Sequence, residues 1–167
     1  FIYLYASRAI CLSLGFKESG LGILELIPIE GEVDIVQAPH NIIDRRLFQS
    51  GWLEKLHDLD IEIHTRSVFL QGLLLMPRNS IPNYFSSWSY LWNKWHEWLV
   101  DKDITAIQAC MNYALSFKKV NKIIVGVDSL LQLKQILEVV GELTDYDFPN
   151  IHSNDEMLIN PSLWKLK

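Results

Sequence analysis

Cysteine is scarce in this sequence, and its distribution excludes two kinds of site. The chain has Cys11 and Cys110, which lie far apart, and no CxxC pair. A disulfide framework or a structural zinc site needs several thiols at short spacing, so we expect neither. The histidines also lack a ligand spacing such as HxxxH, so we expect no metal site. Two isolated thiols fit a reducing compartment, and we expect a cytoplasmic protein.

Positive charge and long apolar runs are scarce as well. The 15 Lys and Arg residues are scattered and are outnumbered by 20 Asp and Glu, giving a net charge of −5. This charge disfavours a nucleic-acid partner. The apolar stretch at residues 1–16 is interrupted by Arg8 and is shorter than the about 20 residues that a transmembrane helix needs. It also lacks the basic start and cleavage site of a signal peptide, so we expect no membrane association.

What the chain does have is a strand, a polar turn and an amphipathic helix in succession. Its 49% hydrophobic content over 167 residues is enough for one compact domain. The apolar run at residues 33–36 predicts a buried strand that gives way to a polar cluster at Gln37 and is ended by Pro39. Residues 45–59 then place apolar side chains at helical spacing, and one helix is predicted there despite Gly51.

The same unit recurs twice along the chain. Residues 61–67 alternate as a strand should, and residues 123–125 form a β-branched run that breaks at Gly126. Residues 130–141 follow as a helix with Gly141 as its C-cap. Three such units predict a parallel sheet with right-handed crossovers. Ligand groups would then lie where the strands end, at residues 37–41, 67–73 and 126–129.

Two further segments allow both a functional and a structural interpretation. The aromatic stretch at residues 84–99 follows helical spacing, so it is either a sugar-stacking or membrane-surface helix, or a helix packed on the flank of the sheet, which we favour. Trp98 lies off this stripe and is expected at a subunit or substrate-loop contact. A second helix is predicted at residues 104–117. The run Asp44-Arg45-Arg46 could bind an anion, but helix capping with nearby salt bridges explains it as well.

Together these motifs resemble one family. The stretches VDIVQAPHNIIDRR, RSVFLQGLLLM and IIVGVDSLLQL are similar to the sixth, seventh and eighth strand-loop units of aldo/keto reductases, which are (β/α)8-barrel enzymes. The resemblance covers residues 32–143, with a poorly matched segment at 1–31 and a tail at 144–167. The fold class it implies is α/β, the C-terminal part of a (β/α)8 TIM barrel that is incomplete in this chain, since a full barrel takes about 250 residues.

The resemblance implies cofactor contacts at the ends of the first two strands. Gln37 would hydrogen-bond the nicotinamide carboxamide and so fix which face of the ring meets the substrate. Ser67, Leu70 and Gly72 match the loop that wraps the cofactor pyrophosphate, where a glycine lets the backbone approach the phosphate. Arg66 stands where many members have an aromatic residue that stacks on nicotinamide, although several subgroups have Arg-Ser here.

The third loop bears on which nicotinamide cofactor is used. Gly126, Asp128 and Ser129 match the loop around the adenosine ribose, and Gln132 and Gln135 lie one and two turns into the next helix. In NADPH-preferring members the place of Gln132 often holds Arg, which pairs with the 2′-phosphate. Gln132 and the acidic Asp128 therefore weaken the case for NADPH, and the resemblance implies NADPH or NADH.

The catalytic residues of the family have no counterpart here. The family uses an Asp, a Tyr general acid, a Lys and a His, all from the first four barrel units. None of those four units precedes Val33 in this sequence. His40 stands where members usually have an aromatic residue. We expect an inactive fragment of a reductase that passes hydride from the nicotinamide to a small carbonyl substrate, with the substrate itself left open. The alternative is a non-catalytic half-barrel that self-associates through exposed sheet edges.

Overall fold

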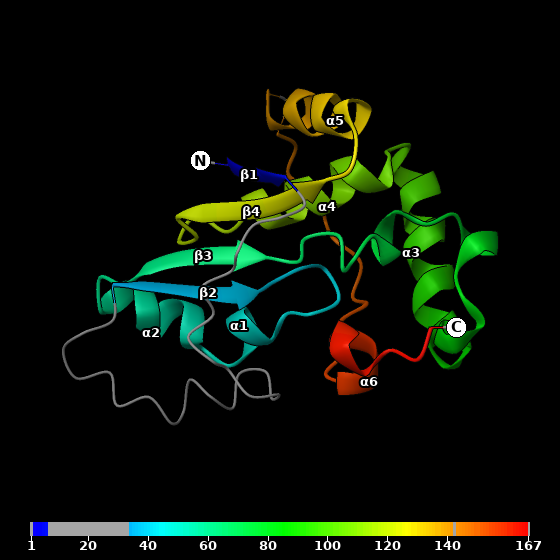
Figure 1. Ribbon diagram of the computed structural model, residues 1–167, viewed down its shortest axis with the longest axis horizontal. Helices are drawn as coiled ribbons and strands as arrows, with labels where there is room; N and C mark the ends of the chain where they lie inside the picture. Colours follow the sequence, from blue (N-terminus) through cyan, green and yellow to red (C-terminus); the bar gives the residue numbers. More distant parts are fainter. Residues whose placement is uncertain (1, 7–33, 142, 167) are drawn as a thin grey trace.

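Four parallel strands form the centre of the protein. The computed structural model describes residues 2–6, 34–141 and 143–166 (Figure 1). Its strands are β1 (Ile2–Ala6), β2 (Ile35–Pro39), β3 (Glu62–Arg66) and β4 (Lys122–Val127). They lie in the order β1-β4-β3-β2, and every pair of neighbours is parallel. The predicted parallel sheet is therefore present, and β1 and β2 are its end strands in the described residues.

Strands β2, β3 and β4 are each followed by helices. After β2 come α1 (Arg46–Gln49) and α2 (Trp52–Asp58), and after β4 comes α5 (Leu130–Gly141). Between β3 and β4, three 3₁₀ turns lead into α3 (Ser89–Lys102) and α4 (Ala106–Leu115); the turns are Leu73–Leu75, Arg78–Ser80 and Asn83–Trp88. The chain closes with α6 (Glu156–Ile159) and a 3₁₀ turn at Pro161–Leu163. Of the poorly matched segment at residues 1–31, only residues 2–6 lie within the described part of the chain.

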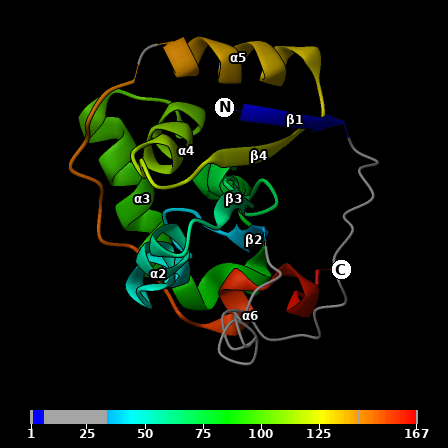
Figure 2. The same cartoon turned by 90° about the vertical axis from the view of Figure 1, so that its left-hand side faces the viewer.

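Side chains alternate between the two faces of the sheet. One face buries five residues: Ala38, Ile63, Thr65, Ile123 and Val125. Apolar residues of α1 and α2 pack on the β2 and β3 part of this face, and those of α4 and α5 pack on the β4 part. Figure 2 shows α2, α3 and α4 on the same side of the strands. The helices thus cover one face, and its side chains form the core.

The opposite face of the sheet is polar and less buried. Glu62 accepts hydrogen bonds from Lys122 at 2.5 Å and His64 at 2.9 Å, because these residues lie beside one another on β3 and β4. The hydrogen bonds from Lys122 and His64 lower the pKa of the Glu62 carboxyl. Gln37 is exposed on the same face, paired in register with His64.

The structure corrects the predicted limits of two strands. Gln37 and Ala38 belong to β2, and Pro39 is its last paired residue, with the next N–H, that of His40, still donating to Arg66 O at 3.0 Å. An end strand tolerates Pro39 because one side of its ladder needs no donor. Ile35 lies on the same polar, less buried face as Gln37 and is 50% exposed, although a buried strand was predicted. Likewise β4 continues through Gly126 to Val127 instead of breaking there.

The single helix predicted over residues 45–59 is in fact two. Gly51 adopts the left-handed conformation with φ of 78°, which ends α1 and starts α2. A left-handed residue cannot continue a right-handed helix, so the glycine breaks the helix that the apolar spacing predicted. Phe48 and Leu59 consequently leave the apolar stripe and are about half exposed.

The aromatic stretch is a packed helix, as the structural interpretation predicted. Trp92 and Trp95 are buried, and their indole N–H groups donate to Phe85 O and Leu74 O. Trp98 stacks on Trp95 and donates to Asp147 O at 3.1 Å, so it contacts the C-terminal tail of its own chain. The start of the stretch lies in a 3₁₀ turn, Asn83–Trp88, instead of an α-helix. None of the helices in the described residues is long and apolar enough to cross a membrane.

Two helix boundaries agree with the sequence. The predicted helix at residues 130–141 is α5, and Gly141 is its last helical residue. The helix predicted at residues 104–117 is α4, which starts with a reciprocal capping box between Thr105 and Gln108. At the tail, the side chain of Asp155 accepts a hydrogen bond from the N–H of Met157 and caps α6.

Candidate functional site

The first polar loop follows β2 and is organised by Asn41. This side chain is 1% exposed. Its Oδ1 accepts hydrogen bonds from the N–H groups of Ile43 and Asp44, both at 2.9 Å, in the manner of an Asx turn. Its Nδ2 donates to Ser67 O at 3.0 Å in the second loop. One buried amide therefore joins the loops that follow β2 and β3.

The Asp44-Arg45-Arg46 run serves the structure of this loop. Buried Asp44 accepts hydrogen bonds from Arg46 Nε and Nη2 at 2.9 Å, and Arg46 also pairs with Glu156 of α6. Arg45 donates to Pro149 O at 2.7 Å, and its guanidinium lies 5.1 Å from the Tyr113 ring centroid. Both guanidinium groups are engaged with the protein itself, which supports the structural reading over an anion site.

His40 takes an aromatic position and not a catalytic one. It is fully buried, and its ring lies 4.4 Å from that of Phe117 and 5.4 Å from that of Tyr113. Neither ring nitrogen has a hydrogen-bond partner among the described residues. Burial, with a smaller effect of the Arg45 charge, lowers the pKa of His40 to about 4. The imidazole is therefore neutral at pH 7.

The second loop, residues 67–72, is tightly turned. Ser67, Leu70, Gln71 and Gly72 all have positive φ, of 62°, 46°, 54° and 82°. Ser67 O accepts from the N–H of Leu70 at 2.9 Å in addition to the Asn41 amide. Leu70 as a whole is 1% exposed, so this residue anchors the loop in the core.

The donors of this loop fit an anionic group such as a pyrophosphate. Gln71 is exposed, and within the described part of the chain its N–H has no hydrogen-bond acceptor. A Cβ on Gly72 would meet nothing within 4 Å, so the space beside this backbone is open. Arg66, also exposed, donates to Ser67 Oγ at 3.0 Å and brings a positive charge to the start of the loop. Left-handed backbone with outward N–H groups next to an arginine suits phosphate oxygens.

The third loop caps α5 with residues that the resemblance assigned to the cofactor. The N–H of Asp128 donates to Gln132 Oε1 at 2.9 Å, and the N–H of Gln132 donates to Ser129 Oγ at 3.1 Å. Asp128 and Ser129 are exposed, as are Gly126 and Gln135. A Cβ at Gly126 would also meet nothing within 4 Å. The loop leaves the Asp128 carboxylate exposed, a group suited to accept hydrogen bonds from ribose hydroxyls.

The structure brings the first two predicted loops into direct contact, and parallel pairing puts all three at the carboxyl-terminal edge of the sheet. The sequence placed Asn41 and Gln71 within the predicted ligand loops but assigned no role to either residue. For Asn41 the signal was an asparagine three residues before an aspartate just after a strand, a pattern typical of an Asx turn. For Gln71 no sequence signal existed, because the residue is not a glycine and its positive φ depends on the loop around it.

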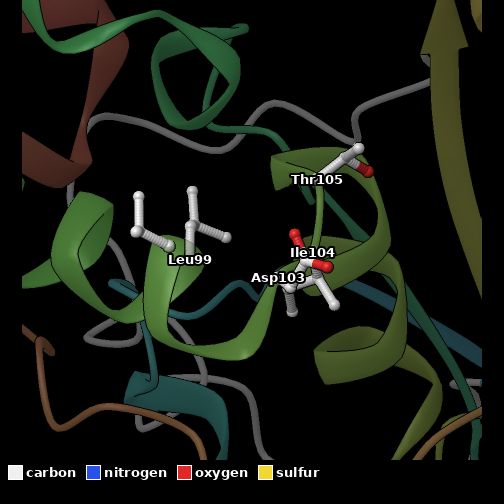
Figure 3. A pocket seen from close by; sticks show the side chains of 5 residues that line it. Leu99, Asp103, Ile104 and Thr105 are labelled. Carbon is white, nitrogen blue, oxygen red and sulfur yellow. The ribbon is translucent and has the colours of Figure 1, made fainter.

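A surface pocket lies elsewhere, where α3 turns into α4. Leu99, Val100, Asp103, Ile104 and Thr105 line it, as Figure 3 shows for four labelled residues. None of the residues assigned to the cofactor lines this pocket. Among the described residues no cluster of His, Cys, Asp and Glu side chains is arranged to hold a metal ion.

Parallel strands joined by helices, with polar loops at their carboxyl ends, define an α/β protein of the class that binds ligands at that edge. The family model of the aldo/keto reductase family matches residues 11–156. The chain belongs to the aldo/keto reductase family. A comparison with curated proteins found no match. Membership implies a (β/α)8 barrel and indicates an oxidoreductase, and the described parallel sheet is consistent with part of such a barrel.

Proposed function

We propose that this chain supplies the cofactor-binding loops of an NAD(P)H-dependent aldo/keto reductase that reduces a small carbonyl substrate to an alcohol. In this proposal it forms the C-terminal part of the barrel, through residues 32–143, and works in the cytoplasm. The segments at 1–31 and 144–167 flank that part. When bound, the nicotinamide supplies the hydride that reduces the carbonyl carbon.

The observation that carries the proposal is the second loop. Residues 67–72 combine a left-handed backbone, a Gln71 N–H with no acceptor among the described residues, and the charge of Arg66 at one edge of the sheet. Ser67, Leu70 and Gly72 would hold the pyrophosphate through this backbone. Gln37 would orient the nicotinamide carboxamide from β2. Five residues of the third loop and α5 would contact the adenosine ribose: Gly126, Asp128, Ser129, Gln132 and Gln135.

The proposal assigns no catalytic acid to this chain. In the family a tyrosine protonates the carbonyl oxygen after a lysine lowers its pKa. Tyr113 is buried, which raises its pKa to about 12. The hydroxyl of Tyr84 donates to Met157 O at 3.0 Å. Burial thus makes Tyr113 a weaker acid than usual, and the Tyr84 hydroxyl is engaged with the tail, so we assign the catalytic role to neither and expect the isolated chain to be inactive.

A titration of NADH and NADPH into the chain tests the proposal. Binding is followed by quenching of tryptophan fluorescence. We expect saturable binding that Gln37→Ala weakens and that the exposed control Gln49→Ala leaves unchanged. Turnover of a small aldehyde is measured in parallel and should be absent. A chain that binds neither cofactor at millimolar concentration contradicts the proposal, and turnover that Gln37→Ala abolishes contradicts the absence of a catalytic acid.

A second candidate function is a non-catalytic module that self-associates. It is favoured by the position of β2 at one end of the described sheet, with Ile35 half exposed. Such an edge can pair with a strand of another chain. Sedimentation of the chain with and without NADH separates the two candidates. A dimer that Ile35→Lys dissociates, together with no cofactor binding, supports the module over the reductase.

A further inference from the structure

We infer that Asn41 is a positioning residue that holds the 67–72 loop in the conformation presented to the cofactor phosphates. The inference rests on the proposed function and assigns to it a residue that would not touch the cofactor. The observation behind the inference is the hydrogen bond of 3.0 Å from Asn41 Nδ2 to Ser67 O. This bond joins the loops that follow two neighbouring strands.

The loop needs such support because its backbone is strained. Ser67, Leu70 and Gln71 have positive φ although none is glycine. Left-handed backbone is unfavourable for a residue with a Cβ, so surrounding contacts must hold it. Buried Leu70 anchors the middle of the loop in the core. At its start, Ser67 O is held by the N–H of Leu70 and by Asn41.

The Asn41 side chain can act as a fixed support because both ends of its amide are engaged. Two N–H groups, of Ile43 and Asp44, point at Oδ1, which leaves Nδ2 to meet a carbonyl. A reversed amide would place donors against donors and a carbonyl against an oxygen, so one orientation is strongly preferred. The acceptor end organises the residue's own loop, and the donor end leaves that loop for the next.

Three variants separate these two roles. Asn41→Asp keeps an acceptor for Ile43 and Asp44 but loses the donor to Ser67 O. Asn41→Ala loses both. Asn112→Ala is the matched control, because Asn112 is also buried, donates to Gln108 O at 2.9 Å and accepts from Thr144 N–H at 2.8 Å, without contact to the cofactor loops.

Three measurements are made on each variant: the dissociation constants of NADH and NADPH, the thermal midpoint, and amide hydrogen exchange of a peptide covering residues 67–75. Both Asn41 variants should bind cofactor about fivefold more weakly, as the loss of one hydrogen bond implies. Their exchange in this peptide should be faster. Asn41→Asp should keep a higher thermal midpoint than Asn41→Ala. Asn112→Ala should lower the midpoint without changing affinity or exchange in the peptide.

Affinity that follows the thermal midpoint across all three variants would overturn the inference, since Asn41 would then act only on stability. Unchanged affinity in both Asn41 variants would overturn it as well. If the wild-type chain binds neither cofactor, the proposed function fails first and with it the role towards phosphate. Hydrogen exchange then decides the remaining claim, because unchanged exchange in both Asn41 variants rules out support of the loop by this amide.

Discussion

The imidazole of His40 meets the Phe117 ring edge-on, with 4.4 Å between the ring centroids. The histidine acts here as an aromatic residue, and neither of its nitrogens is hydrogen-bonded in the described part of the chain. Its burial and the Arg45 charge lower the pKa to about 4. Because His40 packs as a neutral ring, the stability of the folded chain should depend on pH.

The chain should lose stability as the pH falls below 6.5. In the unfolded chain His40 takes up a proton near its ordinary pKa of 6.5, whereas in the folded chain it stays neutral down to about pH 4. The contribution of the neutral His40 side chain to the free energy of unfolding is therefore fully present above pH 6.5. It is lost as the pH falls towards 4. Between pH 7 and pH 5 the loss should be about 2 kcal/mol. Urea denaturation at the two pH values measures it.

His40→Phe keeps the ring and removes the titrating group. We expect this variant to be more stable than wild type at pH 7 by about 1 kcal/mol, because two unpaired buried nitrogens are lost. It should also lack most of the pH dependence between 7 and 5. His57→Asn, at an exposed position, should keep the wild-type dependence. An equally steep dependence in His40→Phe would assign the effect to another group.

Arg46→Ala should be strongly destabilising. Asp44 is 1% exposed, and removal of Arg46 leaves its carboxylate buried without its charged partner. Breaking a buried pair in this way costs about 3 kcal/mol. The variant also releases Glu156, so the tail around α6 should become more sensitive to protease. Thermal and urea denaturation measure the first effect, and limited proteolysis measures the second.

Lys119→Ala provides the control for that prediction. Lys119 pairs with Glu54, but both side chains are substantially exposed, so the pair should contribute less than about 1 kcal/mol. A loss in Arg46→Ala no larger than in Lys119→Ala would mean that Asp44 finds another partner or water in the variant.

The sequence predicted the regular parts of the fold because periodicity and capping act locally. The strand at residues 61–67 is present because its apolar spacing coincides with the core face. The helix at residues 130–141 is present as well and buries Ile136 and Val139, although Leu130, Leu131 and Leu137 are exposed. The break at Gly51 was missed because apolar spacing says nothing of backbone handedness. The exposure of Ile35 was missed because it depends on which face of the sheet the helices cover. Apolar spacing within one segment does not contain that information.

The candidate site was predictable in position but not in its internal connections. Parallel strands put their carboxyl ends at one edge, so the three loops could be located from the strand assignments alone. The link from Asn41 to Ser67 joins residues 26 positions apart, and only strand register brings them together. The pairing of Ser129 with Gln132 is a local capping pattern that could have been recognised from sequence.

Gly51→Ala should destabilise the chain without any steric clash. The φ of 78° is unfavourable for alanine, while a Cβ there would meet nothing within 4 Å. The expected loss is about 1 kcal/mol of unfolding free energy, measured by urea denaturation. Gly126→Ala is the matched control, since its Cβ also has open space and its φ is not positive. An equal loss in both variants would show that handedness is not the cause.

Gln132→Arg should shift cofactor preference towards NADPH if the third loop surrounds the adenosine ribose. A guanidinium near the 2′-phosphate gains charge-assisted hydrogen bonds that NADH cannot make, worth a factor of about 10 in the ratio of the two dissociation constants.

The Gln132→Arg substitution also removes the cap on α5 formed with Asp128 N–H. Gln108→Arg controls for this, because Gln108 fills the same place in the capping box of α4. Fluorescence titration of both cofactors into both variants gives the ratios. The ratio should change in Gln132→Arg alone, and an equal change in Gln108→Arg would place the ribose away from α5.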